Sequence, residues 1–327
     1  MHHLTCRAVF AAFIACATNT GAYAQTTPAQ YPQRTVKFIL PFGPGSGTDI
    51  AARLFAEKLQ TKWGKAIVVE PRPGGDGLIA IRAFLSANDD HTLYYAPTSA
   101  FIVHPYTLQT RPPYEAERDL LPIARTTESA LSIAVSAASG VSTLKEFVAL
   151  ARANPGKLNV AGGQGLAELS LRAFVKEQNL DVTVVPYRDI GQAGPDLAEN
   201  RIQLLSSSLI VPLPHAQAGR AKIAAISGSR RAQLLPDVPT AIEAGFPTIG
   251  YDSTVGFYGP ASMALALRQS IAADILEVLR DPVVTKRLED SGQAVTPDGP
   301  EAFGAIVRAQ IAASARNAQT LGMKPKE

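Results

Sequence analysis

The sequence predicts an α/β protein in which mostly parallel sheets are flanked by helices. Short apolar runs rich in β-branched residues alternate with amphipathic helical stretches over most of the 327 residues. Parallel strands need crossover connections, and the helices between the runs supply them. The length is enough for two domains of ordinary size. Hydrophobic residues make up 46% of the chain and charged residues 18%, which is typical of a soluble globular protein.

Strands and helices follow one another in a regular order. The runs predicted as strands are 36–40, 66–70, 92–96, 131–136, 158–161, 182–185, 202–206, 222–227 and 255–259. The helices predicted between them are 49–63, 78–87, 143–153, 166–178 and 213–218. From residue 260 onward the pattern predicts helices at 265–280, 283–290 and 301–321, and no strong strand. The stretches 111–122 and 229–247 are rich in turn formers and are candidate domain boundaries.

The first 24 residues have the three-part pattern of a secretory signal. His2, His3 and Arg7 precede an apolar run, residues 8–17, and Ala22-Tyr23-Ala24 forms a cleavage triplet before Gln25. The run is too short for a membrane-spanning helix, which takes about 20 residues. A lipoprotein site at Cys16 is the alternative, but Phe13 fits such a site poorly. We expect an exported protein that begins at Gln25.

Cysteine positions and net charge exclude several classes of function. Both cysteines, Cys6 and Cys16, lie in the secretory segment, so the mature chain has no disulfide, zinc-thiolate site or cysteine nucleophile. The formal net charge of +3 becomes +2 when Arg7 is removed with that segment. No basic run or stripe occurs, so we do not expect a nucleic-acid partner.

A glycine-rich segment, residues 41–49 (PFGPGSGTD), joins a strand to a helix. Its glycines can expose several backbone N–H groups near the helix start, where the helix dipole favours an anion. A plain strand-to-helix turn remains the alternative. The spacing is not the dinucleotide-binding fingerprint, because Thr48 replaces the last glycine, and no lysine follows as in a P-loop.

Two further glycine-rich loops, residues 71–77 and 161–166, also connect a strand to a helix. Loops at the carboxyl ends of parallel strands are where such sheets bind ligands. A backbone N–H aimed at a carboxylate contributes about 1.5–3 kcal/mol as a charge-assisted hydrogen bond. Three such loops therefore predict a site for a small carboxylate.

Catalytic and metal-binding patterns are missing from the sequence. The histidines after the secretory segment, His91, His104 and His215, are widely separated and never at metal-ligand spacing. No glycine-x-serine-x-glycine elbow occurs. We therefore expect no enzyme, no metal and no cofactor. An exported hydrolase with Asp49 or Asp189 as a base remains the alternative.

Six segments, taken in order, resemble the Bug or TctC-like receptors, the periplasmic substrate-binding proteins of tripartite tricarboxylate transporters. They are 31–53 (with YPQR and PFGPGSGTDIAAR), 68–77 (VVEPRPGGDG), 153–158 (ANPGKL), 163–165 (GQG), 185–188 (VPYR) and 235–245 (LPDVPTAIEAG). The resemblance implies a two-lobed flytrap fold with a ligand cleft between the lobes. Lobe 1 would comprise residues 25–128 and 249–327, and lobe 2 residues 129–248.

The resemblance also implies which residues bind the ligand, mainly through backbone amides. From lobe 1 they are Phe42, Gly43, Gly45, Ser46, Asp49, Gly74, Gly75, Thr98 and Ser99. From lobe 2 they are Gly162, Gly163, Gly165, Leu166, Tyr187, Asp189 and Ser207.

Some of these positions depart from the family pattern. Ser46 replaces a usual glycine and adds a hydroxyl that either faces the ligand or caps the helix. Gly162 replaces a common serine, and Asp189 replaces a usual glycine. Ser207 stands where the family often has an aspartate at the end of the strand. Such an aspartate would suit an ammonium or hydroxyl group of the ligand. These changes leave the identity of the ligand open.

The expected function is a monomeric periplasmic receptor that captures a small carboxylate for uptake. Its partners would be a large and a small membrane subunit of a tripartite permease. A sensing module that serves a signalling domain without a role in transport is the alternative.

Overall fold

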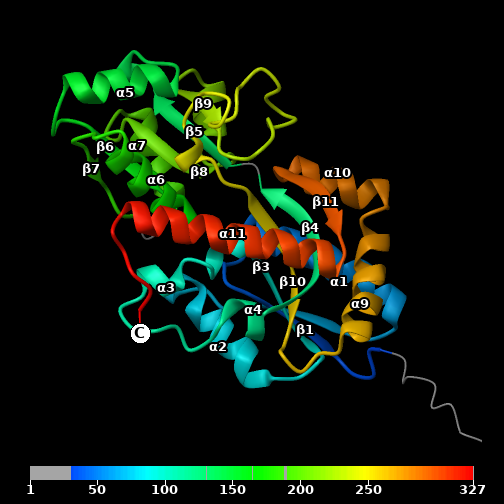
Figure 1. Ribbon diagram of the computed structural model, residues 1–327. Coiled ribbons are helices and arrows are strands. Elements are labelled where there is room, and N and C mark those ends of the chain that lie inside the picture. Colours follow the sequence, from blue (N-terminus) through cyan, green and yellow to red (C-terminus); the bar gives the residue numbers. More distant parts are fainter. Residues whose placement is uncertain (1–30, 130, 164, 188–189, 327) are drawn as a thin grey trace, which may run out of the picture.

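The computed structural model describes residues 31–129, 131–163, 165–187 and 190–326. They form two β-sheets, each covered by helices, so that the molecule has two lobes (Figure 1). The predicted secretory segment, residues 1–24, and Asp189 lie outside the described residues. Within the described ranges, the structure contains no helix that combines the length and the apolar character of a membrane span.

The six-stranded sheet has the order β11-β4-β10-β3-β1-β2. Its strands are β1 (Val36–Leu40), β2 (Ile67–Pro71), β3 (Thr92–Pro97), β4 (Leu121–Ser129), β10 (Ser253–Gly259) and β11 (Gln293–Asp298). β1 is parallel to β2 and β3, whereas β10 is antiparallel to both β3 and β4, and β11 is antiparallel to β4.

The five-stranded sheet has the order β7-β6-β8-β5-β9. Its strands are β5 (Leu131–Ser136), β6 (Asn159–Gly162), β7 (Thr183–Val184), β8 (Leu204–Ser208) and β9 (Ala221–Ile226). β6 is parallel to β7 and β8, and β5 is antiparallel to β8 and β9. The predicted α/β class is thus confirmed, but each sheet is mixed rather than mostly parallel. The antiparallel pairs arise because the chain enters and leaves each lobe through β4, β5, β9 and β10.

Helices cover both faces of the six-stranded sheet. The helices of the structure are α1 (Gly47–Trp63), α2 (Leu78–Ala87), α3 (His104–Thr107), α4 (Ala116–Asp119), α5 (Leu144–Ala153), α6 (Leu166–Glu177), α7 (Ala193–Ala198), α8 (Leu213–Gln217), α9 (Leu265–Val278), α10 (Pro282–Asp290) and α11 (Pro300–Thr320). Phe38 and Tyr95 pack with α1, α9 and α10, whereas the neighbouring Ile39 and Tyr94 pack with α2 and α11. Side chains that alternate along a strand point to opposite faces, so both faces are apolar.

The chain passes between the sheets twice, from β4 to β5 and from β9 to β10. Figure 1 shows α11 lying along the boundary between the lobes. There it packs against α6, and Asn317 Nδ2 donates a hydrogen bond to Ser170 Oγ at 3.0 Å. The lobes are therefore joined by a helix contact as well as by the two crossings.

Two strands, β4 and β11, were not predicted from the sequence, because polar residues and a proline interrupt their apolar pattern. In β4, Arg125 forms ion pairs with Glu128 at 2.8 Å and with Asp298 of β11 at 2.6 Å. These pairs let charged side chains lie half-buried in the sheet, which breaks the apolar pattern of a central strand. β11 contains Pro297, and it can do so because it is the edge strand. The sequence predicted no strong strand after residue 260 and so missed β11, whereas the three helices expected there are present.

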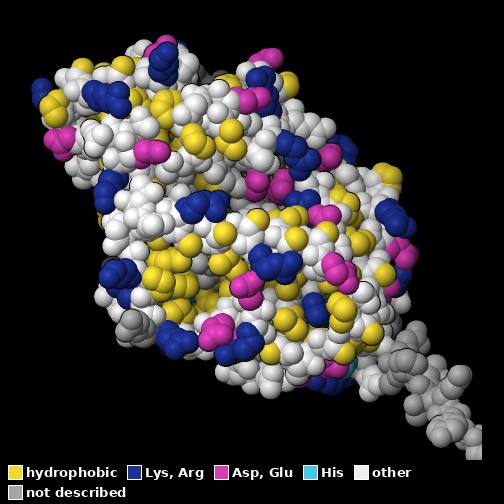
Figure 2. All heavy atoms as spheres, viewed as in Figure 1, with side chains coloured by type: hydrophobic (Ala, Val, Ile, Leu, Met, Phe, Trp, Pro, Cys, Tyr) yellow, Lys and Arg dark blue, Asp and Glu magenta, His cyan; other side chains and the backbone are white. Residues whose placement is uncertain are grey.

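On the face shown in Figure 2, Lys and Arg side chains are interspersed with Asp and Glu. Many of them are paired across elements. Lys58 Nζ lies 2.7 Å from Asp281 Oδ2, and Lys62 Nζ lies 2.6 Å from Glu277 Oε2. These pairs join α1 to α9 and to the start of α10. Because these pairs are exposed to solvent, which screens them, they contribute little to stability.

Gly256 is required where α11 crosses the sheet. A Cβ atom at Gly256 would lie 2.5 Å from Ala124 O and from ring atoms of Phe303. We predict that Gly256→Ala lowers the free energy of unfolding by about 2 kcal/mol or more, because this site cannot accept a methyl group without shifting α11. Urea denaturation measures the change.

The control is Gly304→Ala, in α11 directly after Phe303. Its Cβ would meet only the flexible end of Arg308 at 3.4 Å and Pro122 at 4.0 Å. Alanine favours a helix interior over glycine, so this variant should be as stable as the wild type or more so. Equal stability of Gly256→Ala and the wild type would contradict the claim that α11 leaves no room for a methyl group at Gly256.

Candidate functional site

Three loops of the six-stranded lobe meet at one edge of the sheet. Loop A (residues 41–46), loop B (72–77) and loop C (98–103) follow β1, β2 and β3, which are parallel and therefore end at the same edge. The loops touch at Gly77, whose backbone has a φ of +90°. A Cβ atom there would lie 3.2 Å from Ala100 O and 3.3 Å from Pro41 Cβ. The two glycine-rich loops of this lobe therefore lie together at one edge of the sheet, beside loop C.

Loop A is held by the start of α1. Asp49 N donates to Ser46 Oγ at 3.2 Å, so the Ser46 hydroxyl caps the helix. Gly45 N donates to Asp49 Oδ2 at 3.0 Å. Arg53 lies 2.9–3.0 Å from both carboxylate oxygens of Asp49. Of the two roles open for Ser46, the structure supports capping.

The charge of Asp49 is already balanced within the protein. Burial, the largest single influence, would raise the pKa of this carboxyl, but the hydrogen bonds from Arg53 and Gly45 and the charge of Arg53 outweigh it and lower the pKa. The carboxyl therefore stabilises the fold at neutral pH, and this contribution is lost only as the pH falls through the lowered pKa. The positive end of the α1 dipole is thus occupied by the protein's own carboxylate.

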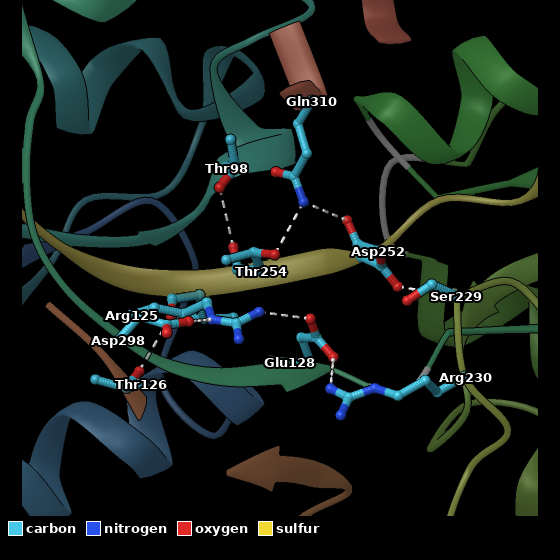
Figure 3. A network of polar contacts seen from close by, with 11 residues as sticks. Thr98, Arg125, Thr126, Glu128, Ser229, Arg230, Asp252, Thr254, Asp298 and Gln310 are labelled. Atoms are coloured by element: carbon cyan, nitrogen blue, oxygen red, sulfur yellow. Dashed lines mark hydrogen bonds and ion pairs between the residues drawn. The ribbon is translucent and has the colours of Figure 1, made fainter. Parts of the chain in front are cut away.

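In loop C the Thr98 side chain faces the core and not the edge of the sheet. Its hydroxyl lies 3.2 Å from Thr254 O (Figure 3). The same hydroxyl lies 3.1 Å from the Tyr258 hydroxyl. Gln310 of α11 donates to Thr254 Oγ1 at 2.9 Å and completes this buried network. The Thr98 hydroxyl is therefore engaged inside the sheet, and the placement of Thr98 at the ligand stays a prediction for its backbone. Ser99, the next residue, is only half-buried.

Loop D (residues 163–165) connects β6 to α6 in the five-stranded lobe. Gly163 N donates to Ser206 O at 2.8 Å, so this amide is not free for a ligand, contrary to expectation. Gly162 is buried in β6, and a Cβ there would lie 3.1 Å from Glu168 Cα. Its glycine therefore serves the close packing of α6 on the strand.

Gly165 brings the two lobes into contact. It has a φ of +76°, and a Cβ atom on it would lie 2.6 Å from Ser99 O of loop C. It also begins α6, and no described side chain caps this helix. Leu166 and Leu169, in the first turn of α6, are buried in the apolar cluster of α2 and α11 on the six-stranded sheet. The start of α6 is thus seated against the opposite lobe with its first amides uncapped.

The other predicted residues lie around this contact or apart from it. Gly74 and Gly75 are exposed in loop B, and Phe42 and Gly43 are half-buried in loop A. The Tyr187 hydroxyl donates to Asp196 Oδ2 at 2.6 Å; burial, followed by the influence of Asp196, raises its pKa to about 12. Ser207 is buried, and its hydroxyl donates to Ser208 O at 3.2 Å.

Two residues that position the loops were not found from the sequence. His104 Nε2 donates to the carbonyl of Asp76 in loop B at 3.0 Å, and its Nδ1 lies 2.5 Å from the Tyr114 hydroxyl. Gln293 Nε2 donates to Gly47 O at 2.8 Å, and Gln293 Oε1 accepts from Thr127 at 2.8 Å. An isolated histidine or glutamine gives no signal, because its partners lie far away in the sequence.

A group of acidic residues around His91 has the residue types of a metal site but is internally satisfied. Asp89, Asp90 and His91 lie within 4.8 Å of one another. His91 Nε2 accepts from Gln33 N at 3.1 Å, and its Nδ1 lies 2.5 Å from Asp90 Oδ1. Both ring nitrogens are therefore in use, and we assign no metal to this group.

A cavity of about 500 Å³ lies elsewhere, between β11 and the loop 228–234. None of the predicted site residues lines it. The candidate site is therefore the contact of loops A–D, and not this cavity.

Comparisons with known proteins find relatives of similar fold and sequence. An R. palustris protein solved with adipate has a TM-score of 0.77 and 25% identity, covering 90% of this chain and 99% of that chain. MatC of Rhodopseudomonas palustris, solved with bound malate, has a TM-score of 0.75 and 26% identity, covering 88% of this chain and 99% of that chain. A UPF0065 protein of Bordetella bronchiseptica is 31% identical over 306 residues, 93% of this chain and 89% of that protein.

The family model described as tripartite tricarboxylate transporter family receptor matches residues 51–322. This range includes loops B, C and D and most of both sheets. The two-lobed fold, the converging loops and this match agree, and the chain belongs to the TctC family of tripartite tricarboxylate transporter receptors.

Proposed function

We propose that this protein is a periplasmic receptor that captures a small carboxylate between its two lobes and delivers it to the membrane subunits of a tripartite permease. The observation that carries the proposal is the contact of Gly165 with Ser99, which brings the uncapped start of α6 against loops A–C. Relatives solved with adipate and with malate support a carboxylate ligand.

The electrostatics of the two helix starts favour α6 as the carboxylate anchor. The first N–H groups of a helix and its dipole attract an anion. At α1 these groups are partly satisfied by Ser46 and Asp49, whereas at α6 no described side chain takes this role. A ligand carboxylate at Gly165 and Leu166 would meet free amides there. Its remaining atoms would face Phe42, Gly43, Gly45, Gly74, Gly75 and Ser99.

Closure of the lobes would follow from this arrangement. A ligand shifts the equilibrium toward a closed form only if it binds that form more tightly, and amides contributed by both lobes provide the difference. We propose residues 25–128 with 249–327 as one lobe and 129–248 as the other. The support is that β4 ends at Ser129 and that β10 begins at Ser253. Export with cleavage before Gln25 completes the proposal.

The first test is a thermal-shift panel of matched acids and neutral analogues. We expect adipate, malate or benzoate to raise the melting temperature, and adipamide and benzamide to leave it unchanged, because the site offers N–H donors and a helix dipole. A ligand at about 100 times its dissociation constant stabilises the protein by about 2.7 kcal/mol. Shifts with neutral amides or sugars, and none with any acid, would refute the proposal.

A second test compares succinate with aspartate, which differ by one ammonium group. Among the described site residues, the carboxylate of Asp49 is paired with Arg53, and Ser207 is not acidic. A buried ammonium would lack a counter-charge, which is costly. We expect aspartate to bind at least tenfold more weakly than succinate in calorimetry. Equal or tighter binding of aspartate would show that another acid reaches the site.

The third test compares two glycines that share a positive φ. Gly165 and Gly140 both have a φ of +76°, but ψ is -129° at Gly165 and 2° at Gly140, and a Cβ atom at Gly140 would meet no atom within 4 Å. Alanine at Gly140 carries a left-handed strain of about 1–2 kcal/mol. Alanine at Gly165 is strained as well, because L side chains rarely adopt its φ, and it also pushes loop D away from Ser99. We expect both variants to lose stability, and only Gly165→Ala to lose affinity for the best acid of the panel, by tenfold or more.

Calorimetry and a thermal melt of each variant measure the two effects separately. If Gly165→Ala and Gly140→Ala bind the acid with the same affinity, loop D is not part of the site.

A further inference from the structure

The cavity of about 500 Å³ lies where the two lobes join. Its walls are formed by Glu128, Ser129, Leu131, Ile226, Gly228, residues 230–234, Asp252, Ser253, Glu289, Asp290 and residues 292–296. They belong to the junction of β4 and β5, the end of β9 and the loop after it, the start of β10, the end of α10, and β11. The cavity is thus bounded by segments of both lobes and by both chain crossings.

The strand order places this cavity on the opposite side of the crossings from the candidate site. In the six-stranded sheet, β3, β1 and β2 lie on one side of the crossing strands β4 and β10, and β11 lies on the other. In the five-stranded sheet, β8, β6 and β7 all lie on one side of β5 and β9. Loops A–D follow β1, β2, β3 and β6, so the crossings separate these loops from the cavity.

The basic side chains that the loop 228–234 contributes to the cavity are already paired. Arg230 Nη2 lies 3.0 Å from Glu128 Oε2, and Glu128 also accepts from Arg125 (Figure 3). Arg231 Nε lies 2.9 Å from Glu243 Oε2. Neither of these arginines is free to hold an anion, so the cavity has little to offer a second ligand.

The same contacts fix the base of the loop 228–234 to the crossings. Ser229 N donates to Asp252 Oδ1 at 2.7 Å, beside the Arg230–Glu128 pair. Beyond them, residues 231–234 face α10 and β11 across the cavity, and Leu234 is 59% exposed. Within the described ranges, no hydrogen bond or ion pair joins residues 231–234 to residues 289–296. The gap between them is open space.

We propose that this cavity is the free space into which the loop 228–234 moves when the lobes open, and we call this space the clearance. If the lobes part at loops A–D by turning about the two crossings, the loop 228–234 must move toward α10 and β11 and narrow the cavity. In this structure loop D touches loop C and the cavity is open, as a closed form requires. The inference rests on the proposed function, because opening and closing serve a protein that captures a ligand.

A bulky side chain in the cavity should therefore hold the lobes closed. When only a fraction of the protein is in the binding-competent form, the apparent dissociation constant equals the intrinsic constant divided by that fraction. A variant that is always closed should therefore bind with the intrinsic, lower dissociation constant. The effect acts at a distance, since no cavity residue belongs to loops A–D.

The test is Ala294→Trp. Ala294 lines the cavity, is exposed, and lies on the edge strand β11 opposite Glu128, so a larger side chain does not disturb the core. We expect at least about threefold tighter binding of adipate, or of the best acid of the panel, in calorimetry. We also expect the radius of gyration of the unliganded variant, from X-ray scattering, to fall toward that of the ligand-loaded wild type.

Ala261→Trp is the matched control, because Ala261 is also exposed but follows the far end of β10. It should change neither quantity. Ala232→Trp, from the opposite wall of the cavity, should act like Ala294→Trp and guards against a local effect on β11.

The two readouts separate this inference from the proposed function. If no acid binds any variant but Ala294→Trp still lowers the radius of gyration, the proposed function fails and the clearance stands. If both tryptophan variants at the cavity fold cooperatively with wild-type radius and wild-type affinity, the clearance proposal is overturned.

Discussion

The helix α6 belongs to two apolar cores at once, and the rest of the arrangement depends on this. Leu166 and Leu169 are buried in the cluster of the six-stranded lobe, while Leu171 and Phe174 are buried in the cluster of the five-stranded lobe. Burying one leucine contributes about 1.5–3 kcal/mol, so pulling α6 out of either core is unfavourable. Opening of the lobes at loop D must therefore work against this packing. The position of loop D at the start of this helix makes the site sensitive to that motion.

Much of the fold could be predicted from the sequence because most elements follow a hydrophobic period. The strands around Phe38 and Val160 and the helices of the last sixty residues have clear patterns. β4 does not, because its charged residues are balanced by partners that the sequence does not reveal: Arg125 pairs with Asp298, and Glu128 pairs with Arg230. The direction of the crossing strands was also beyond prediction, since a strand pattern does not encode whether its neighbour runs parallel or antiparallel.

The candidate site was predicted at the level of loops but not of single groups. Glycine spacing identified where the backbone bends at the sheet edges. It could not tell which amides are free, because Gly163 donates to Ser206, a residue on a different strand. The same limit applies to Ser46 and Thr98, whose hydroxyls are engaged within the protein. Resemblance to a family indicates which residues lie at the site. Whether a given amide or hydroxyl is available to a ligand depends on the hydrogen bonds that it already makes within the protein.

The buried His104 has a consequence for the chemistry of capture. Burial, the largest influence, lowers the pKa of its imidazole, so it holds the carbonyl of Asp76 as a neutral donor. The pKa of Asp49 is lowered as well, and that of Tyr187 is raised to about 12. None of these groups around the loops changes its charge near neutral pH. If the ligand is a weak acid, the external acidity then sets how much of it is present as the anion, while these three groups keep their charge.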